Sequence, residues 1–492
     1  MVSASSKIRI HCVSIYMRAC TLGILTLIVV GSLSFFGKVF AQNAAPSDGS
    51  AAIKADLIRL RDAALADDYT YRQLAHLTDN IGARPEGSPQ AQAAVEYVAD
   101  DLRNLGLEVR LEECKVPHWF RGVETAELVQ FPGQVPGALQ QIALTALGGN
   151  APTPREGITA EVAVVNDFDE LKKLGREKIA GKIVLFNVIF DKQKAAAGLA
   201  SEAYGEAVVY RGQGGRAAAE FGAVASLVRS VGGADYRLPH TGWSMPAGIP
   251  QGAVTSEDAG LIARLAAQGT VRMRLTLTSQ NGPEVTSYNV VGDLRGYENP
   301  AQIVIVSGHL DSWDLGTGAI DDGAGVAVAL EAARLVQQLH LHPKRTIRVV
   351  AWMDEEDGGA GHDAYAKAHH AEFSDYVGAI ESDFGAAHPF GFEAKIKPEA
   401  LPLLIPVQDV LASLGANVIH LTSRSPGADI QALAEADVPT FGIMQDARSY
   451  FNYHHSGADT LDKVDPRQLQ ENAAAMTVLA YELAEMPQPL PR

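Results

Sequence analysis

The sequence predicts an α/β fold in which a mostly parallel central sheet is flanked by helices, with a smaller α+β unit inserted into it. Two observations support this fold class. From about residue 286 onward, strand-like apolar runs alternate with helical segments, which is typical of a parallel sheet covered on both faces. The chain also has 492 residues, which is too long for one ordinary core. Of these residues 47% are hydrophobic, so the chain is expected to fold. We therefore expect more than one domain.

Residues 1–41 have the pattern of a secretory signal peptide. They contain four lysines and arginines and no acid, and an apolar stretch at 21–36 precedes the small residues Val39 and Ala41. Cleavage after Ala41 is expected, and with it an exported protein that is periplasmic or secreted. An uncleaved membrane anchor is the alternative, because the apolar stretch is nearly long enough to span a bilayer.

The charge and cysteine content exclude several classes of partner and bond. The formal net charge is −17, and removal of the signal makes it more negative. Such a surface disfavours nucleic acids and anionic lipids, so we expect no nucleic-acid partner and, after signal cleavage, no membrane association. Cys114 is the single cysteine beyond the predicted signal, which excludes an internal disulfide in the mature chain.

The next two regions differ in character. Residues 42–120 are predicted to be the N-terminal part of the catalytic domain: 51–66 has helical spacing, a second helix ends near Gly106, and the residues that follow it alternate like a strand. Residues 121–285 mix short β-rich runs with Gly-rich turns and Ala-rich helices. We predict that this stretch is a separate α+β unit.

Residues 286–492 are predicted to form the main part of the α/β domain. The expected strands are 287–294, 301–309, 345–354, 376–383 and 438–444, and the expected helices are 325–339, 360–370 and 401–415. Ligands of such folds bind beyond the carboxyl ends of the strands. The residues that follow each strand are therefore candidates for a functional site.

Acidic and histidine side chains gather at these positions. The segment "GHLDSWDLGTGAIDDGAG", residues 308–325, contains one histidine and four aspartates, more than a solvated turn requires. The candidates are His309, Asp311, Asp321, Asp322, Glu355, Glu356, Asp383, His454 and His455. So many carboxylates cannot share one site as bare anions, because like charges raise one another's pKa. A bound dication resolves this conflict.

The ligand types indicate which cation. Histidine with carboxylate and no thiolate suits zinc or another hydrolytic first-row metal, and two ions can share one carboxylate. We predict two zinc ions per chain, bridged by Asp321. His309 and Asp383 would complete one site, and Glu356 and His455 the other.

Two further residues receive supporting roles. Glu355 is left free to accept a proton from water as the general base. Asp311, two residues beyond His309, is expected to accept the other ring N–H of that histidine and to set its tautomer. Each residue alone has an ordinary explanation: Asp321 and Asp322, for example, could simply cap the helix that follows. A metal site explains all of them together.

Other catalytic motifs are absent from the sequence. No GxSxG elbow and no HExxH helix occurs, which argues against a serine hydrolase and a thermolysin-like protease. The string "GTGAID" lacks the spacing of a dinucleotide loop and would place a phosphate against aspartates.

Four strings in this order resemble the co-catalytic zinc aminopeptidase and carboxypeptidase family, and within it the plasma glutamate carboxypeptidase (carboxypeptidase Q) type: "SGHLDSWDLGTGAIDDGAG", "DEEDGGAG", "ESDFGA" and "YHHSGADT". The resemblance implies the zinc exopeptidase fold, with residues 121–285 as an inserted protease-associated domain. It also implies a short peptide substrate and a homodimer. Finally, it selects His455 over His454 as the ligand and Glu355 over Glu356 as the base. His454 stands where some members have a tyrosine that steadies the oxyanion, which implies a role in polarising the carbonyl.

These expectations combine into an exported two-zinc aminopeptidase or dipeptidase acting on dipeptides or short peptides with a free N-terminus. A glutamate-type carboxypeptidase is the alternative; it would need cations such as Arg424 or Arg448 to bind the terminal carboxylate. A non-catalytic binding protein on this fold should have lost ligands. A glutaminyl-cyclase-like enzyme resembles a single-zinc version of the site.

Overall fold

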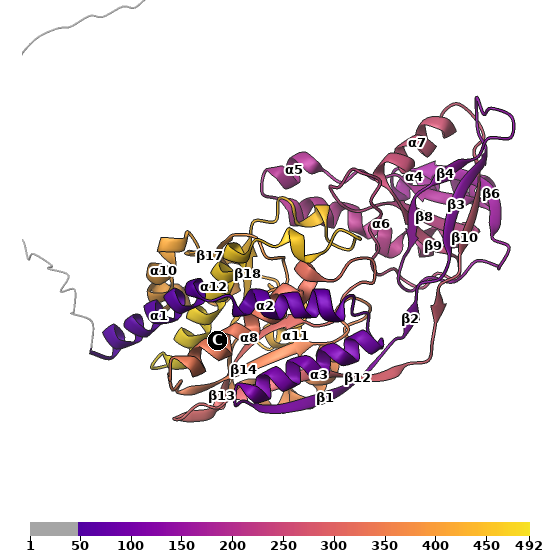
Figure 1. Ribbon diagram of the computed structural model, residues 1–492. Coiled ribbons are helices and arrows are strands. Elements are labelled where there is room, and N and C mark those ends of the chain that lie inside the picture. Colours follow the sequence, from indigo (N-terminus) through magenta and orange to yellow (C-terminus); the bar gives the residue numbers. More distant parts are fainter. Residues whose placement is uncertain (1–47) are drawn as a thin grey trace, which may run out of the picture. The chain divides into compact units, whose positions relative to one another are not determined.

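The strands of residues 48–492, which the computed structural model describes, form two eight-stranded sheets and one two-stranded sheet (Figure 1). The predicted signal peptide, residues 1–41, lies outside the described residues. Among the described helices, none combines the length and the apolar character needed to cross a membrane.

The first eight-stranded sheet has the order β1-β12-β14-β13-β15-β18-β16-β17. These strands are β1 (Glu108–Val116), β12 (Val285–Leu294), β13 (Asn299–His309), β14 (Arg345–Trp352), β15 (Tyr376–Glu381), β16 (Pro389–Lys395), β17 (Val418–Leu421) and β18 (Thr440–Gln445). The four central strands, β14, β13, β15 and β18, are parallel. The pairs β1–β12, β12–β14 and β18–β16 are antiparallel, whereas β16 pairs parallel with β17. The sheet is therefore mixed, and four of its seven strand pairs are parallel. Antiparallel neighbours need no crossover helix, and alternation of strands and helices does not reveal them.

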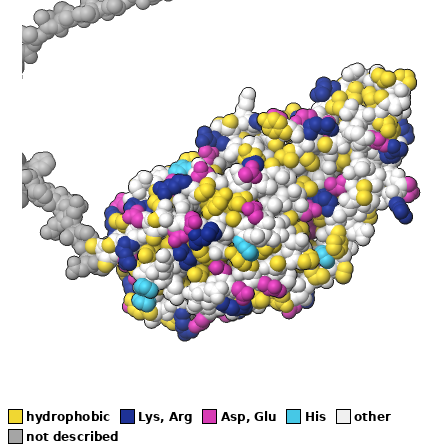
Figure 2. All heavy atoms as spheres, in the orientation of Figure 1, with side chains coloured by type: hydrophobic (Ala, Val, Ile, Leu, Met, Phe, Trp, Pro, Cys, Tyr) yellow, Lys and Arg dark blue, Asp and Glu magenta, His cyan; other side chains and the backbone are white. Residues whose placement is uncertain are grey.

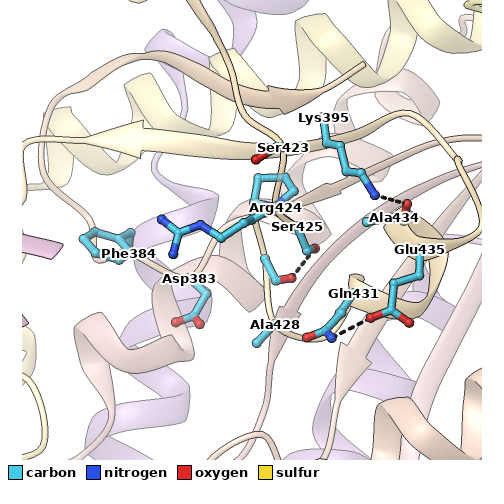
Figure 3. A pocket seen from close by; sticks show the side chains of 12 residues that line it. Asp383, Phe384, Lys395, Ser423, Arg424, Ser425, Ala428, Gln431, Ala434 and Glu435 are labelled. Atoms are coloured by element: carbon cyan, nitrogen blue, oxygen red, sulfur yellow. Dashed lines mark hydrogen bonds between the residues drawn. The ribbon is translucent and has the colours of Figure 1, made fainter. Parts of the chain in front are cut away.

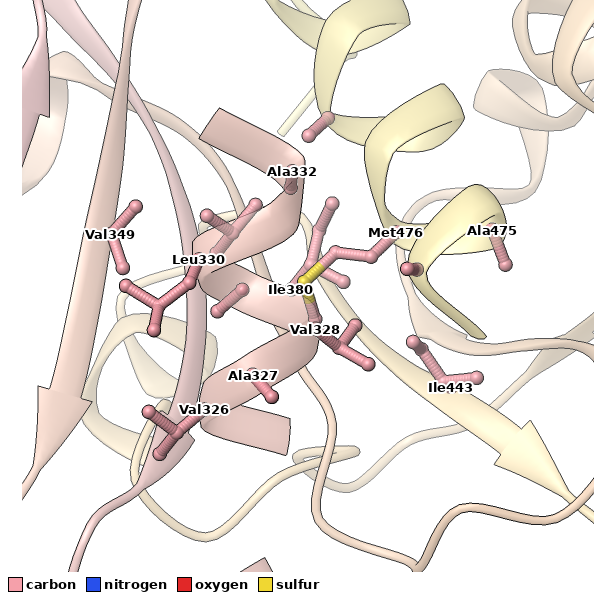
Figure 4. Packing of buried hydrophobic residues seen from close by; sticks show 14 of the residues in the cluster. Val326, Ala327, Val328, Leu330, Ala332, Val349, Ile380, Ile443, Ala475 and Met476 are labelled. Carbon is pink, nitrogen blue, oxygen red and sulfur yellow. The ribbon is translucent and has the colours of Figure 1, made fainter. Parts of the chain in front are cut away.

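Helices cover both faces of this sheet. One face packs against α3 (Pro89–Asn104), α8 (Ala324–Gln338) and α12 (Pro466–Glu485), and the other against α9 (Ala360–His369) and α11 (Gln431–Glu435). α1 (Asp48–Ala66) packs on α12 and α8. Figure 4 shows Val326 and Leu330 of α8 directed toward Val349 of β14, with Met476 of α12 on another side of the helix. Nearly every residue of α8 is buried, and the helix packs on the central strands β13 and β14. This packing holds the N-terminus of α8 at the carboxyl ends of those strands.

The structure differs from the expected elements at two places. The segment 401–415 is not one helix but a 3-10 turn (Pro398–Leu404), a short α10 (Ile405–Leu411) and another 3-10 turn (Ala412–Leu414). Pro402 and Pro406 lack the N–H groups that a continuous helix requires. Helix α12 and strands β16 and β17 were not predicted. α12 is buried on most sides, so its sequence lacks a polar face that would mark a surface helix.

The second eight-stranded sheet has the order β4-β3-β10-β6-β7-β8-β9-β5. Its strands are β3 (Glu124–Gln130), β4 (Gln140–Ile142), β5 (Leu144–Ala146), β6 (Ile158–Val165), β7 (Ile183–Phe186), β8 (Ala225–Arg229), β9 (Gln251–Val254) and β10 (Arg272–Leu277). The helices of this region are α4 (Phe168–Ile179), α5 (Lys192–Ala196), α6 (Ala200–Glu220) and α7 (Ser256–Ala266). Separate apolar clusters fill its two sides. Its assignment as a protease-associated domain with boundaries at 121 and 285 stays a prediction.

A short ribbon of β2 (Trp119–Phe120) and β11 (Gln280–Asn281) joins the two chain segments that lead into and out of the second sheet. α2 (Tyr69–Ala75) lies against α8. On the face drawn in Figure 2, basic and acidic side chains are interspersed and do not gather into one basic patch.

Candidate metal centre

Three parallel strands of the first sheet deliver the candidate ligands. His309 is the last residue of β13, Glu356 follows the end of β14, and Asp383 follows the end of β15. Asp321 lies in the short segment Ala319–Gly323 directly before α8, and His455 lies in the loop that follows β18. The carboxyl ends of neighbouring parallel strands share one edge of the sheet, so these side chains meet there.

Asp321 stands between two groups of ligand atoms. Its Oδ1 lies 3.4 Å from Nε2 of His309, which is also 3.4 Å from Oδ1 of Asp383. Its Oδ2 lies 3.2 Å from Nε2 of His455, which is 2.9 Å from Oε2 of Glu356. Each oxygen of this one carboxylate therefore faces a different set of ligands.

His454 lies in the same cluster as its neighbour. Its Nε2 is 3.5 Å from Oδ2 of Asp321, and its ring stacks on that of His455 with centroids 3.6 Å apart. Asp321, His454 and His455 offer ligand atoms within 4.8 Å of one another, as do His309, Asp321 and Asp383. The geometry therefore places His454 beside the ligand atoms, and its role as a carbonyl polariser stays a prediction.

Unpaired buried atoms test whether a cation fits this cluster. Nε2 of His309, Oδ2 of Asp321 and Oε1 of Glu356 are buried and have no hydrogen-bond partner within residues 48–492. Burying polar groups without a partner is costly, and bound metal ions would satisfy all three atoms. The mixture of imidazole and carboxylate suits zinc. The residues present therefore fit the metal.

The pKa shifts of the clustered residues also support a cation site. Burial alone would raise the pKa of Asp321, but the neighbouring histidines, His454 first, hold it well below its usual value. Burial alone would lower the pKa of His309, but Asp383 and Asp321 hold it well above its usual value. The cluster thus favours positive charge among its carboxylates. Glu355, in contrast, has its pKa raised well above the usual range, chiefly by burial.

Asp311 supports the site differently from the expected way. Nδ1 of His309 lies 3.1 Å from the backbone carbonyl of Asp311 and 3.8 Å from its carboxylate, so the carbonyl accepts the ring N–H. The carboxylate instead accepts the backbone N–H groups of Asp354, Glu355 and Glu356 at 2.8, 3.3 and 3.2 Å. Asp311 thus orients the candidate ligand His309 and holds the loop that carries the predicted base.

The sequence left open whether Asp321 and Asp322 bind a metal or cap a helix, and the structure gives the two residues different positions. The Asp322 carboxylate accepts the backbone N–H of Gly325 at the start of α8 and that of His309, both at 3.0 Å. It therefore caps the helix and fixes the end of β13. Asp459, beyond the histidine pair, accepts the N–H groups of Ala319 and Ile320 and holds the segment in front of Asp321.

A cavity of about 500 Å³ opens over the cluster. Glu355, partly exposed, lines it together with Asp383 and His362. The second sheet's region contributes Tyr204 and Arg211, both on α6. Nη1 of Arg211 lies 3.2 Å from Nδ1 of His455 and donates to the Tyr204 hydroxyl at 2.8 Å. Sequence reasoning missed both residues, because no local pattern connects position 211 with position 455.

Comparison with known proteins agrees with this site. Residues 289–480 match Peptidase family M28. The chain is 38% identical over 486 residues to Carboxypeptidase Q of Xenopus laevis, covering 95% of this chain and 99% of that protein. It is 34% identical to the crystal structure of a peptidase M28 precursor from Shewanella amazonensis, with a TM-score of 0.84 over 90% of this chain and 100% of that one.

A more distant structure shows the fold alone. The aminopeptidase from Aneurinibacillus sp. strain AM-1 is 21% identical, with a TM-score of 0.61 over 86% of this chain and 95% of that one. Fold, ligand set and relatives together define a hydrolase of the zinc metallopeptidase class. The chain belongs to peptidase family M28.

Proposed function

We propose that this chain is an exported exopeptidase that binds two zinc ions and hydrolyses dipeptides or short peptides with a free N-terminus. The observation that supports two ions is the position of Asp321, whose two oxygens face His309 on one side and His455 on the other. Asp383 would complete the first site and Glu356 the second. A shared carboxylate of this kind is typical of two-metal hydrolases.

The residues around the cluster have distinct tasks in the proposed reaction. Bound zinc would supply Lewis-acid chemistry, polarising the scissile carbonyl and acidifying a water molecule. Glu355 would accept a proton from that water and donate it to the leaving amine. Asp311 holds the backbone of Glu355 through a hydrogen bond, which keeps the carboxylate in the cavity. His454, whose Nδ1 lacks a partner among the described residues, would donate to the carbonyl oxygen.

The requirement for a free N-terminus is inferred from the cavity lining. A substrate amine would sit against the metal cluster beside the carboxylate of Glu355. An acyl cap removes that amine. Export rests on the pattern of residues 1–41, and a homodimer and a protease-associated domain rest on the family resemblance.

Metal analysis with a substrate screen tests this proposal. We expect close to two zinc ions per purified mature chain, and loss of activity after chelation with recovery on adding zinc. We also expect turnover of Ala-Ala and no turnover of acetyl-Ala-Ala. Full activity after verified metal removal would exclude the zinc mechanism, and equal turnover of the two peptides would exclude the requirement for a free amine.

A carboxypeptidase preference is the second candidate, favoured by the name of the relatives, Carboxypeptidase Q. Of the two arginines considered for it, Arg448 is exposed and paired with Asp446, whereas Arg424 lines a cavity beside the cluster. Peptides with an acetylated N-terminus and a C-terminal glutamate distinguish the candidates, because only a carboxypeptidase accepts them.

A further inference from the structure

A second cavity adjoins the metal centre. It has a volume of about 550 Å³ and shares Asp383 and Phe384 with the cavity over the metal ligands. Figure 3 shows Arg424 extending from its loop toward these two residues. A substrate that reaches past Asp383 from the metal cluster therefore enters the space that Arg424 lines.

Arg424 differs from the other cations nearby in having no partner. Its guanidinium forms no ion pair and no hydrogen bond with any residue from 48 to 492. Lys395, in the same cavity, donates its ammonium to the carbonyl of Ala434 and points away (Figure 3). Arg448 is paired with Asp446. Arg424 is thus the available fork-shaped donor of this cavity, and a carboxylate is the group that such a fork binds best.

The loop that carries Arg424 is anchored at its C-terminal end. Buried Glu381, the last residue of β15, accepts the backbone N–H groups of Asp429 and Ile430. Oδ1 of Asp429 lies 2.9 Å from Nδ1 of His362, which lines the metal cavity. The loop is therefore tied to the same strand that delivers Asp383. The anchor fixes this end of the loop, and the exposed Arg424 side chain extends from the loop.

We propose that Arg424 binds a carboxylate on the leaving residue of the substrate and so determines specificity. This inference rests on the proposed function, because it assigns a substrate group to the same site. In the proposed function the substrate amine sits against the metal cluster, whereas Arg424 repels an ammonium group and attracts a carboxylate. The substrate would therefore bind with its amino end over the cluster and its anionic end at Arg424. The carboxylate is the chain terminus or an acidic side chain.

Substrates that differ in one charge test the proposal on the full, zinc-loaded enzyme. For the wild type we expect kcat/KM for Ala-Ala to exceed that for Ala-Ala-amide about 10- to 100-fold, the range of one charged hydrogen bond. Arg424→Gln should lower the value for Ala-Ala to that for the amide, mainly through KM, and leave the amide unchanged. Arg448→Gln, also an exposed arginine, should leave both values unchanged.

A second pair of substrates distinguishes the two carboxylate sources. A preference for Ala-Glu-amide over Ala-Gln-amide that disappears in Arg424→Gln assigns the side-chain carboxylate, and its absence assigns the chain terminus. The proposal is wrong if Arg424→Gln keeps the preference for Ala-Ala over its amide, or if it lowers all substrates equally. Zinc content and chelation of the same preparations report on the proposed function separately, since Arg424 contacts no metal ligand.

Discussion

The two eight-stranded sheets use the residues that follow their strands in different ways. In the second sheet, Asp167 follows β6 and caps α4 by accepting the N–H of Glu170 at 2.6 Å, and Thr255 follows β9 and caps α7. In the first sheet, Glu356 and Asp383 follow strands and cap nothing; their carboxylates face the histidines of the metal cluster. An acid after a strand is therefore no evidence of a site by itself.

The neighbours Asp321 and Asp322 show the same contrast within one segment. Asp322 caps α8, just as Asp167 caps α4 in the region of the second sheet. Asp321 stands between the two groups of candidate ligand atoms. What distinguishes a ligand from a cap is convergence: side chains from several strands point at one space.

Replacing one acid in the region of each sheet compares a candidate metal ligand with a helix cap. Asp321→Ala removes the carboxylate that faces both ligand groups, so zinc content and turnover should fall to background. Asp167→Ala removes one helix cap and should lower the free energy of unfolding by about 1 kcal/mol. We expect its zinc content and turnover to match the wild type. Retention of zinc in Asp321→Ala, measured by elemental analysis, would contradict the bridging role.

The Glu355–Glu356 pair separates base from ligand. Glu355→Gln should keep zinc and lower turnover by about 10²–10⁴-fold, because it removes proton transfer alone. Glu356→Gln should lower zinc content together with activity. Zinc content and kcat measured side by side decide the matter: metal loss in Glu355→Gln with retention in Glu356→Gln would reverse the assignment, and two fully active variants would remove both from the site.

The contribution of the second sheet's region to the site is tested at α6. Arg211→Gln loses the guanidinium that donates to the Tyr204 hydroxyl and lies beside His455 in the cavity. We expect kcat/KM to fall about tenfold, the size of one charged hydrogen bond. Arg216→Gln, an exposed arginine of the same helix, is the matched control and should behave as the wild type. Equal kinetics for both variants would mean that this region only encloses the cavity.

The smallest effect concerns a buried acid outside the metal centre. Burial, with Glu485 nearby, raises the pKa of Glu482 on α12 from 4.5 to about 7. Because the folded state disfavours its ionised form, Glu482 lowers stability progressively as the pH rises from about 4.5 to 7. Glu482→Gln should therefore raise Tm by roughly 2 °C at pH 8 and leave it unchanged at pH 4. Exposed Glu399→Gln is the control, and an equal rise at both pH values would exclude titration as the cause.

The sequence predicted the central strands and α8 well because their signals are local. Continuous apolar runs mark strands buried on both faces, and their alternation with helices predicts the parallel part of the sheet. Local signals did not predict the antiparallel pairing of β1, β12 and β16. They also did not predict the helix breaks at Pro402 and Pro406 or the buried helix α12. Edge pairing depends on partners far away in the chain, and a helix buried on most sides has no polar face to mark it.

The residue types that follow each strand can be read from the sequence, and the clustering of His309, Asp321 and Asp383 behind apolar runs was enough to predict metal chemistry. The fold, by contrast, decided that the carbonyl of Asp311 orients His309 while its carboxylate holds the Glu355 loop. It also decided that Arg211 enters the site. Periodicity and short motifs report on neighbours along the chain. These contacts join residues that are far apart in the chain, so they leave no local trace in the sequence.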